Sequence, residues 1–191
     1  MKIMKNQLEI NPFPNKDMIA TVWNVIWPFE HFIFKRKVNV YLIQEFKFST
    51  NTHMVSDWKQ YESALFNVIQ NALKYNQANY GDIILIQTCK PMKGSSTQYV
   101  LETEIIDTGI GIQPDRQNLL FTPFLELRNR IGIVKAENDN IGLGLSCSRE
   151  ISRKLGGDMK LKRSKKGLTS FVFKFPVGLQ DQPLIDIETH D

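Results

Sequence analysis

The chain has 191 residues, of which 42% are hydrophobic and 10% aromatic, so it carries enough apolar side chains for one sizeable core. Its net charge of +4 is too small to indicate a nucleic-acid partner, and no apolar run is uninterrupted enough for a signal sequence or a membrane span. The two cysteines, Cys89 and Cys147, belong to no Cys/His cluster. This argues against a disulfide framework or a zinc site and favours a reducing compartment.

The first predicted elements are a helix and a strand. Asn15-Lys16-Asp17 predicts the start of a helix through Ile19 and Ile26, which Pro28 then interrupts. The stretch 38–48 is rich in Val, Ile, Tyr and Phe, which is typical of a strand.

The helix with the clearest pattern follows Ser56-Asp57 and runs to residue 76. Asn67, Asn71 and Lys74 share one face, at spacing i, i+4 and i+7. Two carboxamide oxygens and one ammonium group suit a hydrated divalent cation with phosphate oxygens. An ordinary solvated helix face remains the alternative reading. The opposite, core-facing stripe consists of Trp58, Tyr61, Leu65, Val68, Ile69 and Ala72.

Two strands, 82–89 and 97–106, lead to the sequence "EIIDTGIGIQ". Asp107 follows the second strand directly, and Gly109 and Gly111 allow the backbone to approach a flat ligand closely. An ionised carboxylate in this position can accept a hydrogen bond from the exocyclic amine of adenine. Asp-Thr-Gly is also ordinary turn chemistry, so this motif alone leaves both readings open.

The chain then turns irregular until Gly142 and Gly144 open a helix that ends at Leu155-Gly156-Gly157. Free backbone N–H groups and the positive end of the helix dipole suit phosphates, although a tight turn would explain the glycines equally well. Strands over 158–163 and 170–175 surround an "SKKG" turn, and 178–191 is expected to be a mobile tail.

In order and spacing, five segments resemble the ATP-binding domain of sensor histidine kinases: "NVIQNALKY", "DTGIGI", "LFTPFLEL", "GLGLSCSREISRKLGG" and "GLTSFVFKFP". They resemble its asparagine box, first glycine box, phenylalanine box, second glycine box and closing strand. The resemblance covers roughly residues 8 to 177. It implies an α+β fold, a two-layer α/β sandwich whose mixed, mostly antiparallel sheet is covered by helices on one face. It divides the chain into a linker from a missing dimerisation domain (1–12), the ATP-binding domain (13–177) and the tail (178–191).

The resemblance also assigns roles to residues. Asp107 would bind the adenine amine, Asn71 would coordinate magnesium, and Tyr75 would lie against the base or ribose. Phe121 and Phe124 would anchor a mobile lid over 125–141, and Thr169 would touch the adenine edge through water. With ATP and Mg²⁺ as cofactors and Asn71 as metal ligand, the predicted ATP-binding residues are Asn67, Asn71, Lys74, Tyr75, Asp107, Gly109, Gly111, Phe121, Gly142, Leu143, Gly144, Leu145 and Thr169.

The residue at position 67 bears on the reaction type. The gyrase, mismatch-repair and chaperone ATPases of the wider group usually carry a glutamate four residues before the magnesium asparagine, where it acts as general base. This chain has Asn67 there, and an amide cannot take a proton. The resemblance therefore predicts transfer of the γ-phosphoryl group to a histidine rather than hydrolysis.

The acceptor histidine is expected outside this chain. His31 follows the linker-like segment and is expected to be partly buried, while His53 and His190 are placed in a polar turn and in the tail. The implied partners are the dimerisation domain of the same kinase and a response regulator or receiver domain, with no nucleic acid. A cytoplasmic location is expected, with any membrane attachment made through missing regions.

Two alternatives remain. Asn140 and Leu168 stand where the family often has glycine, which would suit a degenerate nucleotide-binding regulatory module without kinase activity. The basic run from Lys160 to Lys166 could contact nucleic acid or an acidic partner, but it lacks interleaved aromatic residues and better fits a solvated hairpin.

Overall fold

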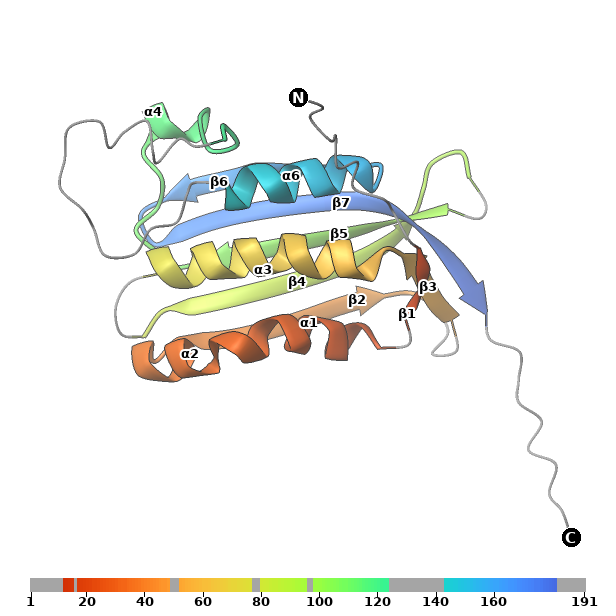
Figure 1. Ribbon diagram of the computed structural model, residues 1–191, viewed down its shortest axis with the longest axis horizontal. Helices are drawn as coiled ribbons and strands as arrows, with labels where there is room; N and C mark the ends of the chain where they lie inside the picture. Colours follow the sequence, from red (N-terminus) through yellow and green to blue (C-terminus); the bar gives the residue numbers. More distant parts are fainter. Residues whose placement is uncertain are drawn as a thin grey trace, which may run out of the picture.

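The computed structural model of the chain describes residues 12–15, 17–48, 52–76, 80–95, 98–123 and 143–181. These residues form one seven-stranded sheet with helices packed on one of its faces (Figure 1). The predicted α+β, two-layer architecture is confirmed.

The sheet is mixed and mostly antiparallel, as predicted. The order is β1-β3-β7-β5-β4-β2, and β6 also pairs with β7. Only β2 and β4 pair in parallel among the described strands. The strands are β1 (Phe13–Asn15), β2 (Asn39–Phe46), β3 (Thr52–Ser56), β4 (Asp82–Pro91), β5 (Gln98–Asp107), β6 (Asp158–Lys165) and β7 (Leu168–Asp181).

Helices α1, α3 and α6 lie side by side on one face of the sheet, and α3 contacts both neighbours (Figure 1). No helix within the described ranges is long and apolar enough to cross a membrane. The helical elements are α1 (Met18–Ile26), the 3₁₀ turn η1 (Trp27–Phe29), α2 (Glu30–Arg36), α3 (Trp58–Tyr75), α4 (Pro114–Gln117) and α6 (Gly144–Lys154).

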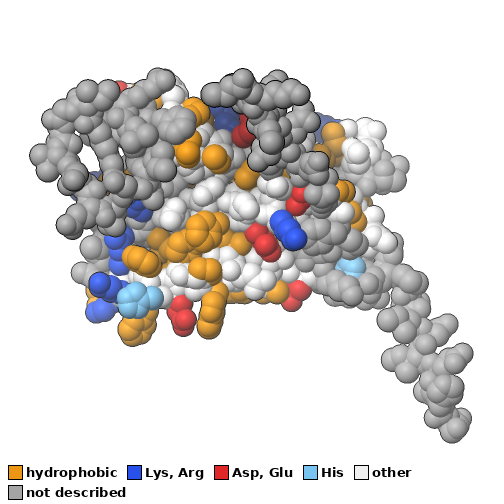
Figure 2. All heavy atoms as spheres, viewed as in Figure 1, with side chains coloured by type: hydrophobic (Ala, Val, Ile, Leu, Met, Phe, Trp, Pro, Cys, Tyr) orange, Lys and Arg blue, Asp and Glu red, His pale blue; other side chains and the backbone are white. Residues whose placement is uncertain are grey.

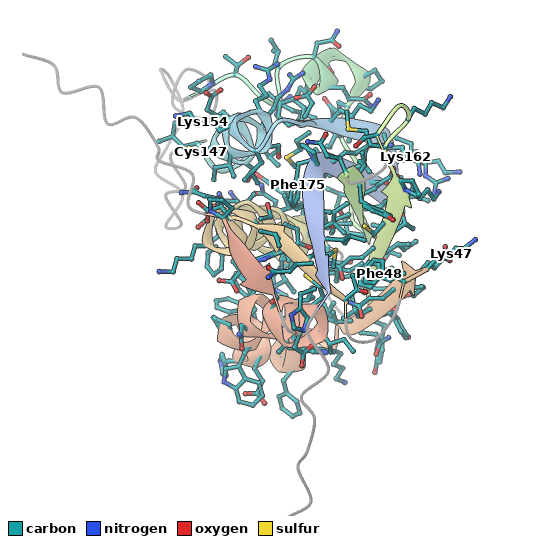
Figure 3. The ribbon with its side chains drawn as sticks, turned by 90° about the vertical axis from the view of Figure 1, so that its right-hand side faces the viewer. Lys47, Phe48, Cys147, Lys154, Lys162 and Phe175 are labelled. Carbon is teal, nitrogen blue, oxygen red and sulfur yellow. The ribbon has the colours of Figure 1, made fainter. Side chains whose placement is uncertain are left out.

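The core lies between α3 and the sheet. The whole predicted stripe of α3 is buried, and Phe173 and Phe175 of β7 meet it from the sheet. Each large apolar side chain buried in this way contributes about 1.5–3 kcal/mol. Tyr61 adds a polar contact, because Gln87 donates to its hydroxyl and Thr103 lies 3.1 Å from it. Figure 3 shows Phe175 on the helix side of the sheet and Lys162 on the opposite side.

The N-terminal α-helix ends at Ile26, ahead of Pro28, as predicted. The Asp17 side chain caps α1 as expected, accepting from Ala20 N at 2.9 Å. Helical structure nevertheless continues through Pro28, because this proline sits in the first turn of η1, where its missing N–H needs no partner. Ile19 is exposed, and Figure 2 shows hydrophobic side chains gathered over α1 and α2. The expectation that His31 is partly buried is wrong, since it lies exposed on α2.

The sequence patterns missed β1 and β3, and they ended the domain too early. His53 lies buried on β3 rather than in a polar turn. The segment 178–181, expected in the tail, continues β7 and pairs with β3, with Gly178 opposite Val55. These short strands form by pairing with segments that are distant in the chain. Such pairing cannot be predicted from the local sequence.

Helix α6 begins at Gly144 as predicted, but it buries a different face. Helix spacing aligns Cys147 with the buried residues Ile151 and Leu155, but Cys147 is exposed on the side of α6 away from the sheet (Figure 3). Ser148 is buried instead, and its hydroxyl donates to Ala64 O of α3 at 3.1 Å and to Gly144 O at 2.9 Å. A small side chain lets the two helices approach closely, and backbone carbonyls satisfy its hydroxyl.

The basic run forms β6 and the turn after it, as expected for a hairpin. Two of its cations are already paired with the Glu104 carboxylate, since Lys162 Nζ lies 2.6 Å and Arg163 Nη2 lies 3.9 Å from it. Ser170 also donates to that carboxylate at 2.6 Å, and these partners hold the pKa of Glu104 below its usual range despite burial.

Candidate functional site

Three segments far apart in the sequence meet at one end of the helix layer. The last turns of α3, the loop after β5 and the first turn of α6 lie on the left of Figure 1. Ile110 N donates to Tyr75 O at 3.1 Å, which joins the loop to α3. A Cβ on Gly144 would lie 3.6 Å from Asn67 Cβ, which places the start of α6 against the same helix. The predicted motifs therefore gather in one place.

Asp107 is the last residue of β5 and is only 5% exposed. Its Oδ1 accepts from Gly109 N at 2.9 Å. Among the residues that the structure describes, none donates to its second oxygen. Burial raises the pKa of Asp107 to about 6, although the bond from Gly109 opposes this rise. A buried carboxylate oxygen without a donor fits an amine of a ligand.

The loop after Asp107 packs tightly between α3 and the β6–β7 turn. A Cβ on Gly109 would lie 2.4 Å from Tyr75 O, and one on Gly111 would lie 2.6 Å from the carbonyl of Lys165. Gly111 also has a φ of +78°, which disfavours other residues. Backbone atoms of the chain itself thus leave no room for a side chain at Gly109 and Gly111. A ligand bound over the loop is not needed to explain these glycines.

Thr169 stands beside Asp107 on the neighbouring strand. The two residues are register partners of β5 and β7, and Thr169 is buried. Its hydroxyl lies 3.2 Å from that of Ser164, which in turn accepts from Ile112 N at 2.9 Å. The contact of Thr169 with the adenine edge stays a prediction.

The polar face of α3 runs from Asn67 through Asn71 to Lys74, and all three side chains are half-buried. Lys74 Nζ lies 5.0 Å from the centroid of the Tyr75 ring, which is 40% exposed. No cluster of three or more His, Cys, Asp or Glu side chains that could hold a metal occurs in the described ranges. Phosphate oxygens of a nucleotide would suit a magnesium ion at Asn71 as further ligands.

Three further predicted residues that the structure describes, Phe121, Leu143 and Leu145, lie around the start of α6. Phe121 is half-buried, and its ring meets Phe171 edge-on at 6.4 Å between centroids. Leu143 precedes α6 as its N-cap residue, and Leu145 packs partly buried against the core. The structure does not describe the predicted lid anchor Phe124, the lid 125–141 with its Asn140, or Gly142.

Three polar residues that the sequence did not single out connect α3 to the loop after β5. Asn76 Nδ2 donates to Asp82 O at 3.2 Å, and Thr108 Oγ1 donates to Asn76 Oδ1 at 3.3 Å. Asp82 N donates to Thr108 Oγ1 at 2.8 Å. Short polar side chains at a helix end and in a turn commonly bond to nearby backbone, but no local signal pairs these residues with one another.

Arg36 is a further missed contributor. Its Nη1 donates to Leu73 O at 2.6 Å, so a guanidinium from the end of α2 caps the last carbonyls of α3. A cation at the negative end of the helix dipole is favourable, and it fixes the turn that carries Lys74 and Tyr75.

The site thus has two chemically distinct ends. Asp107 and Thr169 offer buried polar groups suited to an amine-bearing heterocycle, while Asn67, Asn71 and Lys74 offer amides and an ammonium group suited to phosphates with a divalent cation.

Comparison with known proteins finds a matching family model and several similar sensor kinases. A family model described as "Histidine kinase-, DNA gyrase B-, and HSP90-like ATPase" matches residues 56–179. The autoinducer 2 sensor kinase/phosphatase LuxQ of Vibrio harveyi is 30% identical over 184 residues, covering 96% of this chain and 20% of that protein. The signal transduction histidine-protein kinase BarA of Escherichia coli K12 is 26% identical over 182 residues, covering 95% of this chain and 18% of that protein. The chain spans about a fifth of the length of these relatives.

Solved structures show the same fold. Full-length ShkA in complex with AMPPNP has a TM-score of 0.68 at 21% identity and covers 93% of this chain and 33% of its own. The nucleotide-free catalytic domain of histidine kinase ThkA has a TM-score of 0.62 at 19% identity and covers 88% of this chain and 98% of its own.

Proposed function

Because the chain belongs to the family of histidine kinase-, DNA gyrase B- and HSP90-like ATPases, we propose that it binds Mg-ATP and supplies the γ-phosphoryl group to a histidine on a separate dimerisation domain. The observation that carries this proposal is the buried Asp107 carboxylate, which has an acceptor oxygen available to the amine of adenine. The sensor kinases among the relatives support the choice of kinase over the other branches of the family.

Each end of the site has a defined role in the transfer. Asp107 holds the base, and Thr169 supports its edge. Asn71 and Lys74 orient the phosphates, so that the γ-phosphorus lies open to an incoming imidazole nitrogen. Asn71 would hold magnesium, which would neutralise negative charge on the phosphates during transfer. A P–N bond forms as the bond between the γ-phosphorus and the β–γ bridging oxygen breaks, and ADP leaves.

Asn67 favours this transfer over hydrolysis. Its side chain borders the start of α6, at the phosphate end of the site. A carboxylate in that position could take a proton from an attacking water, whereas an amide cannot. Positioning and charge stabilisation are therefore the contributions of this chain, and the nucleophile comes from the partner.

We further propose a response regulator or receiver domain as the final phosphoryl acceptor. A structure of ThkA in complex with the response regulator protein TrrA contains a domain of this fold, with a TM-score of 0.59 at 18% identity.

The test is incubation with γ-labelled ATP and magnesium, first of the chain alone and then with the cognate dimerisation domain. The chain alone should bind ATP, hydrolyse it slowly at most, and acquire no acid-labile label. Label should appear on the added domain. Rapid multiple-turnover hydrolysis would favour the hydrolytic relatives, and absence of ATP binding would favour the degenerate regulatory module. Label on the chain that disappears in His31→Gln would overturn the assignment of the acceptor to a partner.

A further inference from the structure

Arg149 of α6 stacks on an aromatic ring from another segment. Its guanidinium carbon lies 4.7 Å from the centroid of the Phe121 ring. The turn that carries Phe121 follows α4 and lies beside the first turns of α6 in Figure 1. A guanidinium over an aromatic face is attracted by the negative face of the ring, and more strongly where water is excluded.

Asp158 at the start of β6 holds the same guanidinium in place. Arg149 Nε donates to Asp158 Oδ1 at 2.9 Å, and Nη2 donates to Oδ2 at 3.1 Å. This two-point contact fixes the plane of the guanidinium, which a single-point pair would not do. The bond from Arg149 is the main reason that the pKa of Asp158 falls to about 2.

Phe121 also contacts β7, since its ring meets that of Phe171 edge-on. The contacts therefore run without a break from Asp158 through Arg149 and Phe121 to Phe171. They join the turn after α4 to the helix that starts at Gly144, the residue beside Asn67.

We propose that Arg149 is a positioning residue that sets the affinity of the site for the triphosphate half of ATP. This inference rests on the proposed function. Arg149 fixes the position of the turn that carries Phe121 relative to the start of α6. The start of α6 borders the phosphate end of the site. The adenine end depends on Asp107, Thr169 and the loop between them and α3, none of which Arg149 contacts among the described residues.

The chain offers a matched control for a purely structural ion pair. Arg153 also donates to Asp158, at 3.3 Å, but it is 53% exposed and has no contact with Phe121 among the described residues. If the ion pair with Asp158 alone determined the affinity for Mg-ATP, replacing either arginine would change that affinity equally.

The experiment compares the affinities of Mg-ATP and adenosine for the parent chain and for Arg149→Gln, Arg149→Lys and Arg153→Gln. Arg149→Gln should weaken Mg-ATP binding about 3- to 30-fold, the range expected for a cation–π contact, and leave adenosine affinity within about twofold. Arg149→Lys should restore part of the loss, because lysine keeps the charge but not the two-point contact. Arg153→Gln should match the parent.

A double variant separates positioning from a general loss of folding. Phe121→Leu should reproduce the selective loss for ATP, and adding Arg149→Gln to it should cause no further loss, because both changes break the same contact. Equal affinities of the parent and Arg149→Gln for Mg-ATP would refute the inference alone, as would equal losses for ATP and adenosine. Failure of the parent chain to bind ATP would refute the proposed function and the inference with it.

Discussion

The Asp107 carboxylate is buried with a single hydrogen bond from Gly109 among the described residues, an arrangement that opposes folding. The unfolded chain releases the proton of this group near pH 3.8, whereas the folded chain retains it up to about pH 6. Its contribution to stability is therefore greatest below pH 3.8 and is lost as the pH rises through 6. At neutral pH the charged group destabilises the fold, which is understandable if it serves a ligand.

Asp107→Asn should accordingly raise stability while it weakens ATP binding. The difference between a pKa of about 6 and 3.8 sets an upper limit of roughly 3 kcal/mol on the gain in unfolding free energy at pH 7. Loss of a hydrogen bond to a charged group should weaken ATP binding by about 1.5–3 kcal/mol. Denaturant unfolding and calorimetric titration measure the two effects. Asp115→Asn on exposed α4 is the control and should change neither. An unchanged ATP affinity in Asp107→Asn would refute the adenine assignment.

Nucleotide affinity should also fall as the pH drops through about 6, because protonation of Asp107 removes its charge. Titrations of ADP between pH 5 and 8 measure this, at about the pH values that bracket the folded pKa. The Asp107→Asn variant should retain only the weaker dependence that comes from the nucleotide phosphates. Identical pH profiles for the parent and this variant would contradict the role of the carboxylate.

The sequence singled out residues whose chemistry follows from their neighbours in the chain. It did not single out residues that act through tertiary contacts. Asp107 was identifiable because it ends a strand and precedes glycines. Asn76 and Arg36 acquire their roles only when α3 meets the β5 loop and α2. Ser148 was missed because helix periodicity assigns buried positions to apolar residues, and close helix packing here favours a small hydroxyl.

One face of helix α3 packs on the sheet, and the opposite face bears the polar residues of the candidate site. Its apolar stripe fixes the helix on the sheet, so the amide of Asn71 is presented on a rigid element. Asn71→Ala should therefore remove the magnesium-dependent part of ATP binding and leave the protein folded. Affinities measured with magnesium should differ between variant and parent, and those measured with a chelator should not. Ser63→Ala, on the exposed side of α3, is the control. Equal losses with and without magnesium would refute the role of Asn71.

The loop after β5 is built by backbone contact with the end of α3. Gly109→Ala would place a methyl group 2.4 Å from Tyr75 O, so it should destabilise the protein by about 1–3 kcal/mol and weaken nucleotide binding. Gly178→Ala meets only Val55 at an ordinary 3.6 Å and should change stability by less than about 1 kcal/mol. Thermal unfolding of both variants measures this. Equal stabilities of the two variants would show that the loop can move away from α3.

Long elements with a regular pattern were predicted to within a few residues, as α3, β4 and β5 illustrate. The short strands β1 and β3 were not, because they exist through pairing with each other and with the end of β7. The same pairing extends the folded domain to Asp181, beyond the end that composition indicated.

At the scale of the whole molecule, the sheet order brings the motifs together. β5 and β7 are neighbours and α3 lies between α1 and α6, so segments separated by many residues form one site. The order and spacing of five motifs predicted the family, and the family match confirms that prediction. The roles of the two ends of the site stay predictions, and the contacts of Asn76 and Arg149 beside them were not predicted.

The central claim is that adenine is recognised by Asp107 and the phosphates by the polar face of α3. The most direct test is a crystal structure of this chain with magnesium and a non-hydrolysable ATP analogue. The exocyclic amine should lie about 2.9 Å from the free oxygen of Asp107, and magnesium should lie about 2.1 Å from Asn71 Oδ1. A base bound away from Asp107, or phosphates directed away from α3, would contradict the account.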